Sequence, residues 1–167
     1  MPSMSQMTKP VFNQMLGAMS KILDLLSAHC EAKKIDPAVF LQARLYPDMF
    51  PFTRQVQIAC DFSKGAVARL SGRDAPTFAD DETTIEQLKA RIANTLAFVN
   101  AVPDSELDGT EAKIVTMTAR GQDMTFPGDV YVAHVVLPNV HFHCATAYGI
   151  LRHNGLEMGK MNYLGRV

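Results

Sequence analysis

The sequence lacks the features on which nucleic-acid-binding proteins and membrane proteins depend. Its 16 basic and 17 acidic residues leave a formal net charge of −1, so it lacks the basic surface with which nucleic-acid-binding proteins neutralise phosphates. Its apolar runs are far shorter than the roughly 20 residues that cross a bilayer as a helix. Residues 1–9 are polar and rich in Met, without the apolar core of a secretory signal. We therefore expect a cytoplasmic protein that binds neither nucleic acid nor membrane.

Cysteine is also scarce. Cys30, Cys60 and Cys144 are odd in number, widely spaced and set among apolar residues. This pattern does not suit a disulfide framework and favours buried thiols in a reducing compartment. There is no Cys-x-x-Cys pair or Cys/His cluster of the kind that holds structural zinc. With 167 residues, of which 47% are hydrophobic, the chain is expected to form one domain, residues 1–167, with a substantial core.

What the sequence does contain is helical periodicity. Apolar side chains recur at spacings of three and four residues, the pattern of an amphipathic helix. Long helices are predicted at residues 10–32, 51–70, 84–102 and 128–155. Pro10 is expected in the first turn of the first helix, and Thr83 with Glu86 forms a predicted capping box before the third. A short helix is expected at 38–42, followed by an apolar loop at 43–51 that should pack over the end of the other helices.

A second kind of periodicity separates the third and fourth helices. Residues 113–118 and 122–126 alternate around Gly121, which predicts two strands of a hairpin. A hairpin alone is marginally stable, so it should lie against the helices. The predicted fold is therefore mainly all-α, an antiparallel four-helix bundle with a small β-hairpin between helices three and four.

The fourth helical segment concentrates the unusual residues. Apolar side chains fall on nearly every side of it, which predicts burial all round. One bundle cannot easily cover such a helix, so we expect a homodimer in which this helix contributes to the interface. His134, His141 and Tyr148 share one side, either as a polar seam for a partner or ligand, or as dimer-interface or core positions. Pro138 removes a backbone donor and should kink or restart the helix.

Three motifs carry a resemblance to a known family. They are DMFPFTRQVQIACDFSKGAVARLSG (residues 48–72), LPNVHFHCATAYGILRHNG (137–155) and GKMNYLG (159–165). On these motifs the chain resembles the DinB-like (YfiT-like) metalloenzyme superfamily, in a branch known only as a domain of unknown function. Metal-binding members of that superfamily carry one histidine on helix two and a His-x-x-x-His pair on helix four.

The resemblance implies a metal site that has lost most of its ligands. His143 matches the second histidine of helix four, whereas Asn139 takes the place of the first and Gln57 that of the helix-two histidine. Neutral amide oxygens are poor partners of imidazole for zinc or nickel, so a bound divalent metal is disfavoured and His143 remains a weak candidate ligand. Asp61 lies one turn beyond Gln57 and is a further pocket candidate.

Two functions from different classes follow. The first is a small-molecule-binding protein that uses a polar pocket of Gln57, Asp61, Asn139 and His143 derived from the degenerate metal site. The alternative is a metal-dependent enzyme that acts on small molecules, as a thiol transferase or isomerase, with His143 as acid, base or ligand. No recognisable nucleophile–base pair assigns catalytic residues, and this absence favours the first function.

Overall fold

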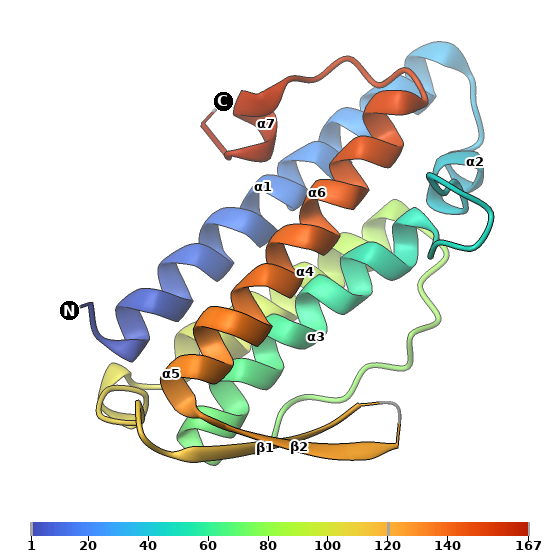
Figure 1. Cartoon of the computed structure of the whole chain (residues 1–167). Coiled ribbons are helices and arrows are strands. Elements are labelled where there is room, and N and C mark those ends of the chain that lie inside the picture. The colour runs from blue at the N-terminus through green and yellow to red at the C-terminus, as the bar shows by residue number, and fades with distance from the viewer. Residues whose placement is uncertain (1, 120, 167) are drawn as a thin grey trace.

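The computed structural model describes residues 2–119 and 121–166, and four long helices dominate it (Figure 1). These helices are α1 (Met4–Lys33), α3 (Phe52–Ser71), α4 (Ile85–Ala101) and α6 (Leu137–His153). Helices α1 and α6 run one way and α3 and α4 the other (Figure 1). Because α3 and α4 run in the same direction, the loop at residues 72–84 has to return along the length of the bundle. The predicted four-helix bundle is confirmed.

Two helix starts differ from the sequence prediction. Helix α1 begins at Met4, six residues before Pro10, because Ser3 and Gln6 form a capping box; Pro10 lies inside the helix. Helix α4 is capped one residue later than predicted, by Thr84 and Gln87. Adjacent threonines allow either register, and the chosen one places Ile85 in the core at 3% exposure. Burial therefore decides between two local caps of similar chemistry.

The fourth helical segment is interrupted, as Pro138 predicts. A short helix α5 (Gly128–Val130) leads into the wide turns of η2 (Tyr131–Val136), a π-helix, and α6 then starts at Leu137. The Leu137 amide donates to the Val132 carbonyl, five residues back. Pro138, near the start of α6, has no amide to offer, so the change of helix type falls where an α-helical bond would be missing. Gly155, with φ of +93°, ends the segment as expected.

The predicted hairpin is confirmed between α4 and α5. Strand β1 (Ile114–Ala119) pairs antiparallel with β2 (Gln122–Pro127), with Val115 opposite Phe126. The hairpin lies across one end of the bundle, beside the end of α3 (Figure 1). Val115 is buried there, which attaches the hairpin to the helices. A 3₁₀ turn, η1 (Asp104–Glu106), precedes it in the chain.

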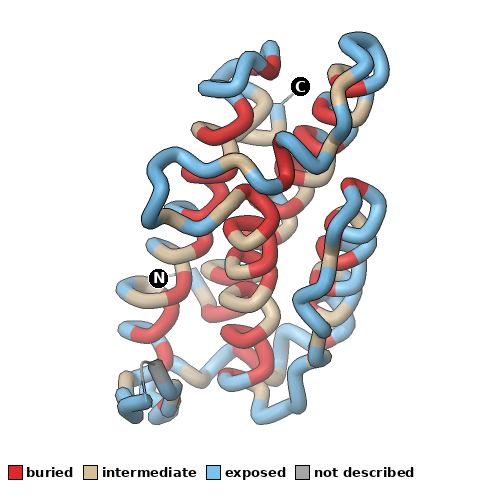
Figure 2. The backbone as a smooth tube through the Cα atoms, turned by 90° about the vertical axis from the view of Figure 1, so that its right-hand side faces the viewer, coloured by how far each residue is buried: buried red, intermediate tan, exposed pale blue. Residues whose placement is uncertain are grey.

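Buried residues lie along the inward sides of the long helices (Figure 2), and their apolar side chains form one core. Phe12, Phe52 and Tyr131 are the bulkiest fully buried aromatic residues. The three cysteines are buried and free, as predicted, and burial raises the pKa of Cys60 to about 12. Among the described residues, no helix is both long and apolar enough to cross a bilayer.

Two shorter helices complete the chain at the other end. Helix α2 (Pro37–Leu41) matches the short predicted helix, and α7 (Lys160–Tyr163) folds back beside α1 and α6 (Figure 1). The apolar loop at 43–51 is not packed away as predicted, because Tyr46 and Phe50 are 65% and 56% exposed. Leu45 of this loop lies close to Gly149 of α6, so the loop forms an exposed apolar surface next to that helix.

Candidate functional site

His143 lies on the inward side of α6 and meets α3. Its Nδ1 is 2.6 Å from Oε1 of Gln55, and the two residues are 8% and 1% exposed. Gln55 Nε2 donates to the Phe50 carbonyl at 3.0 Å, so the oxygen of that amide faces the imidazole. An amide oxygen only accepts, and Nδ1 must therefore carry the proton. This arrangement leaves Nε2 of His143 with its lone pair.

The surroundings of His143 keep the ring neutral. Burial and, next, the positive charge of Arg54 lower the pKa of His143 to about 4. Phe62 stacks on the imidazole at 6.4 Å between ring centroids, and Phe142 meets it edge-on at 5.2 Å. No group among the described residues hydrogen-bonds to Nε2. The site therefore presents one uncharged hydrogen-bond acceptor between aromatic walls.

Gln57, the predicted counterpart of a metal-binding histidine, forms hydrogen bonds to charged side chains in this structure. Its Nε2 donates to Glu82 at 2.7 Å and its Oε1 accepts from Arg54 at 3.0 Å. Residues two apart on a helix point about 200° apart, so Gln55 faces His143 while Gln57 faces the loop at 72–84. Both polar atoms of the Gln57 amide have partners within the chain.

Arg91 of α4 is the centre of the network that includes Gln57. Its side chain is 1% exposed and pairs with Asp61, Asp80 and Glu82 at 2.8, 2.6 and 2.9 Å. The Phe78 ring lies 4.7 Å from the guanidinium carbon, a cation–π contact. These contacts hold the long loop at 72–84 against α3 and α4. Sequence patterning missed this cluster, because a single Arg on a helix carries no signal of burial.

Two carboxylates of this network, Asp80 and Glu82, are held in their charged form. Burial alone would raise the pKa of Asp80 and Glu82, but the hydrogen bonds from Arg91 and its charge outweigh burial, and both pKa values are lowered. Burial opposes the charge of Arg91 as well, but hydrogen bonds to Glu82 and Asp80 raise the pKa of the guanidinium. Asp61 also pairs with Lys64 at 3.2 Å. Asp61 is therefore committed to a structural ion-pair network.

Asn139 is tied to its own helix. Its side-chain amide donates to the Val135 carbonyl at 2.7 Å, at the junction between η2 and α6. Among the described residues, no hydrogen bond joins Gln57, Asn139 and His143 to one another. The predicted pocket residues thus divide into a helix-junction residue, an ion-pair network and the His143–Gln55 pair.

This donor set does not fit the three-ligand metal site that the resemblance implies. Gln57 is engaged at both ends and Asn139 donates its amide nitrogen to a backbone carbonyl, so the unengaged ligand atoms are Nε2 of His143 and the side-chain oxygen of Asn139, which is a poor ligand for zinc or nickel. Within residues 2–119 and 121–166, no three His, Cys, Asp or Glu side chains are grouped as a metal ion requires.

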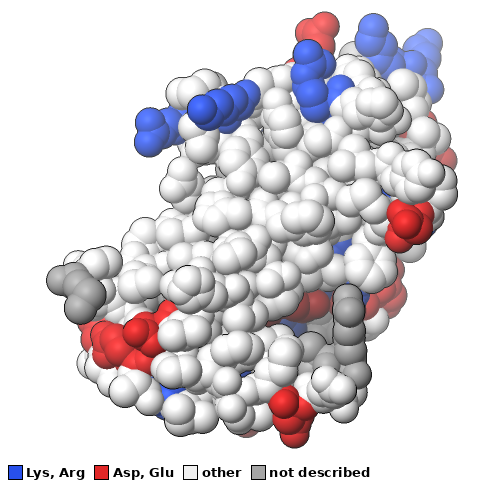
Figure 3. Space-filling model, in the orientation of Figure 1, with Lys and Arg blue, Asp and Glu red and all other residues white. Residues whose placement is uncertain are grey.

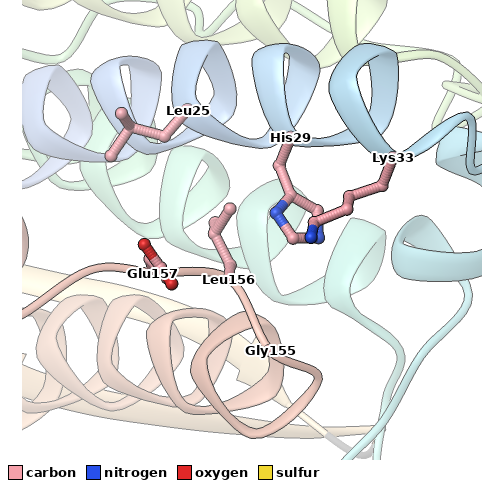
Figure 4. Close-up of a pocket in the computed structure, with 6 residues that line it drawn as sticks. All are labelled: Leu25, His29, Lys33, Gly155, Leu156 and Glu157. Atoms are coloured by element: carbon pink, nitrogen blue, oxygen red, sulfur yellow. The ribbon is translucent and has the colours of Figure 1, made fainter.

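Two cavities bear on ligand binding. One of about 330 Å³ lies between the end of α1 and the segment after α6, where His29 and Lys33 face Glu157 (Figure 4). The other, of about 130 Å³, lies between α3 and β1 and is lined by Asp61, Phe62, Arg69 and Met117. Phe62 is shared between this smaller cavity and the stacking contact with His143. The smaller cavity is thus one aromatic ring away from the histidine.

Of the predicted seam, His134 and His141 are exposed and Tyr148 is partly buried. Nδ1 of His141 lies 3.4 Å from the Tyr163 hydroxyl of α7. The ring of Tyr148 meets that of Tyr163 at 6.0 Å. The seam therefore lies on the outer surface of η2 and α6, and its two α6 residues, His141 and Tyr148, are on the side next to α7.

Comparison with known proteins agrees with the fold and the motifs. The family described as a domain of unknown function (DUF1993) matches residues 4–164. The crystal structure of a DinB family member protein from Shewanella denitrificans is similar with 40% sequence identity and a TM-score of 0.88. The similarity covers 98% of this chain and 92% of that one. No curated protein matches the sequence.

Proposed function

The chain belongs to the DUF1993 branch of the DinB family, and on that premise we propose that it binds a small molecule through the imidazole of His143. The observation that carries the proposal is the fixed tautomer. The Phe50 carbonyl orients Gln55, Gln55 holds the proton on Nδ1, and Nε2 is left as an acceptor. Nε2 is not among the fully buried unpartnered atoms of the described residues, so it can be reached from outside the protein, and a ligand with a donor group would pair with it.

The surroundings define the class of ligand. An uncharged imidazole accepts from a hydroxyl or N–H donor, and the rings of Phe62 and Phe142 offer apolar walls for the rest of the molecule. A cavity of about 130 Å³ adjoins the site through Phe62, but His143 does not line it. From the uncharged imidazole and the aromatic rings we infer a neutral ligand with a hydroxyl, amide or amine donor.

The proposal can be tested by NMR on protein with ¹⁵N-labelled histidine. Long-range spectra at neutral pH should show His143 as the Nδ1–H tautomer. A panel of small alcohols, amides and amines should include compounds that shift its Nε2 resonance. His143→Asn is the matched control, because its amide nitrogen can still donate to Gln55 while the ligand-binding nitrogen is gone. A tautomer with the proton on Nε2, or equal binding by His143→Asn, would contradict the proposal.

A metal-dependent enzyme is the alternative, and the arrangement of donors disfavours it. The Gln57 oxygen would have to abandon its hydrogen bond from Arg54 before it could bind a metal, and the Asn139 oxygen is a poor ligand beside imidazole for zinc or nickel. Elemental analysis of protein purified without chelator distinguishes the two functions. We expect much less than one zinc or nickel per chain, and about one metal per chain would overturn the small-molecule proposal. A cytoplasmic location stays a prediction of the sequence.

A further inference from the structure

The outward side of α6 is unusual for a helix in contact with water. Between Asp129 and Arg152 the chain has no Asp, Glu, Lys or Arg. The exposed residues of this stretch include His134, Pro138, His141, Phe142 and Ala145. Phe142 is 55% exposed. A solvated helix face normally carries charged side chains, so about six turns without one indicate a surface that another molecule covers.

The surface extends to both sides of α6. On the α7 side, Met161 is 46% exposed, and Tyr163 approaches His141 and Tyr148. On the opposite side the loop at 43–51 adds Tyr46 and Phe50, together with other exposed apolar side chains. Figure 3 shows this broad uncharged area across the middle of the molecule. We call α6 and these two borders the α6 face.

Charges of opposite sign lie at the two ends of the α6 face. Three carboxylates, those of Asp108, Glu111 and Asp129, line a hollow of about 710 Å³ near the start of α5. At the far end Arg152 is exposed, whereas the exposed Lys160 and Arg166 lie along the α7 border, where Tyr163 approaches His141. Figure 3 shows basic groups along the upper edge of the uncharged area and acidic groups at its lower left. A partner of complementary pattern must be acidic where this chain is basic and basic where it is acidic.

We propose that the α6 face binds a second copy of this chain, with the two α6 helices antiparallel. A two-fold axis across the helix places the basic end of each copy over the acidic end of the other. Asp129 and Arg152 are separated by 23 residues, about 35 Å of helix. Their midpoint falls between Val140 and His141. The axis therefore passes close to His141, and the exposed Phe142 side chains of the two copies lie beside it.

The available area suits a dimer. A standard interface buries about 800 Å² on each partner. A strip about 35 Å long provides this area with a width of about 23 Å, which a helix roughly 10 Å across reaches when the side chains along both borders are included. A stable dimer therefore needs the side chains of both borders in its interface. These are Met161 and Tyr163 on one border and Tyr46 and Phe50 on the other.

The first experiment compares two substitutions of the same kind. Ala145→Glu introduces a charge on the exposed centre of the α6 face, and Ala93→Glu introduces it on the exposed side of α4. In sedimentation velocity at about 50 μM, the natural protein and Ala93→Glu should be dimers and Ala145→Glu a monomer with unchanged circular dichroism. A monomeric natural protein, or a dimer that persists in Ala145→Glu, overturns the proposal.

The second experiment tests the position of the axis. His141→Cys should form an intermolecular disulfide on mild oxidation, because a residue near a two-fold axis approaches its own copy within the roughly 5.5 Å between Cα atoms that the bond needs. His153→Cys, 12 residues further along α6, should not. The three natural cysteines are buried and do not compete. Cross-linking of His153→Cys without cross-linking of His141→Cys would overturn the antiparallel arrangement.

Discussion

Arg91 and His143 show how buried polar residues divide the interior of this bundle between stability and binding. Arg91 finds three carboxylates, so its charge is balanced, although its Nε lacks a partner. His143 has one ring nitrogen satisfied by Gln55 and the other unengaged. A group with its partners supplied by the chain contributes to the fold, whereas an unpartnered acceptor that can be reached from outside the protein is suited to a ligand.

Replacing Arg91 should be severely destabilising. Arg91→Met keeps the apolar stem and removes the charge, which leaves Asp61, Asp80 and Glu82 without their shared cation. Breaking a buried ion pair in this way costs about 3–5 kcal/mol. We expect the lower end of this range, because Asp61 and Asp80 are 35% and 39% exposed and water can solvate them. Urea unfolding followed by circular dichroism measures the loss.

The control for the Arg91 substitution is the same substitution at an arginine whose ion pair lies on the surface. Arg73→Met removes an exposed ion pair with Glu106 and should change the midpoint of urea unfolding very little, because water screens such pairs. Equal effects of the two substitutions would contradict the structural role assigned to Arg91. Arg91→Lys should fall between them, since an ammonium lacks the planar fork that meets several carboxylates.

At the scale of elements, the segment from Gly128 to His153 is three helical pieces whose junctions have chemical causes. Pro138 lacks a donor, η2 takes up the change of register, and Asn139 donates to the Val135 carbonyl at the junction. The first piece starts against the loop that follows η1, where Gly128 is buried beside Thr110 and Leu70. This close approach determines where the whole segment enters the bundle.

Two glycine-to-alanine substitutions should therefore have opposite effects. A β-carbon on Gly128 would lie 2.2 Å from the Thr110 carbonyl oxygen, a backbone atom that cannot rotate away. Gly128→Ala should lower the thermal midpoint by several degrees or more. At Gly17, inside α1, a β-carbon has nothing within 4 Å. Gly17→Ala should stabilise by about 0.4–1 kcal/mol, because alanine favours the helix and restricts the unfolded chain. Calorimetry of both variants provides the measurement, and a stable Gly128→Ala would refute the close contact.

At the scale of the whole molecule, buried histidine and carboxylates both predict sensitivity to acid. The pKa of His143 is about 4 in the folded protein against 6.5 for a free imidazole, so the unfolded chain binds the proton first. Stability should then fall as the pH drops from 6.5 to about 4. The lowered pKa values of Asp80 and Glu82 contribute stability that is present above their ordinary values of 3.8 and 4.5. That contribution is lost as the pH falls further, through the folded values.

The loss of stability that His143 causes can be separated by substitution from the loss that the two carboxylates cause at lower pH. In His143→Asn the thermal midpoint should depend less on pH between 6.5 and 4 than in the natural protein, while the steep loss at lower pH remains. The measurement is the difference between the two melting profiles across this range. Parallel profiles would show that His143 titrates normally in the folded state.

The sequence by itself determined the helices, the hairpin and the proline junction. Periodicity of apolar side chains reports which face of a local element is buried, and Pro138 acts through the bond it cannot make; both are local properties. Local signals were ambiguous at the helix caps, where Thr83 and Thr84 offer the same chemistry and only the burial of Ile85 decides. The apolar loop at 43–51 was misjudged for a related reason, since composition does not reveal whether a surface is covered by its own chain or remains exposed.

The partners of the polar residues were decided by the tertiary structure alone. Gln55 and Gln57 are both amides on α3, and only the orientation of that helix between α4 and α6 directs the first to His143 and the second to Glu82. Arg91 meets Asp80 and Glu82 because α3 and α4 run in the same direction, which brings the loop at 72–84 back along the bundle. Hydrogen bonds and ion pairs require contact within a few ångströms. Contacts between residues far apart in the chain exist only after the helices have packed.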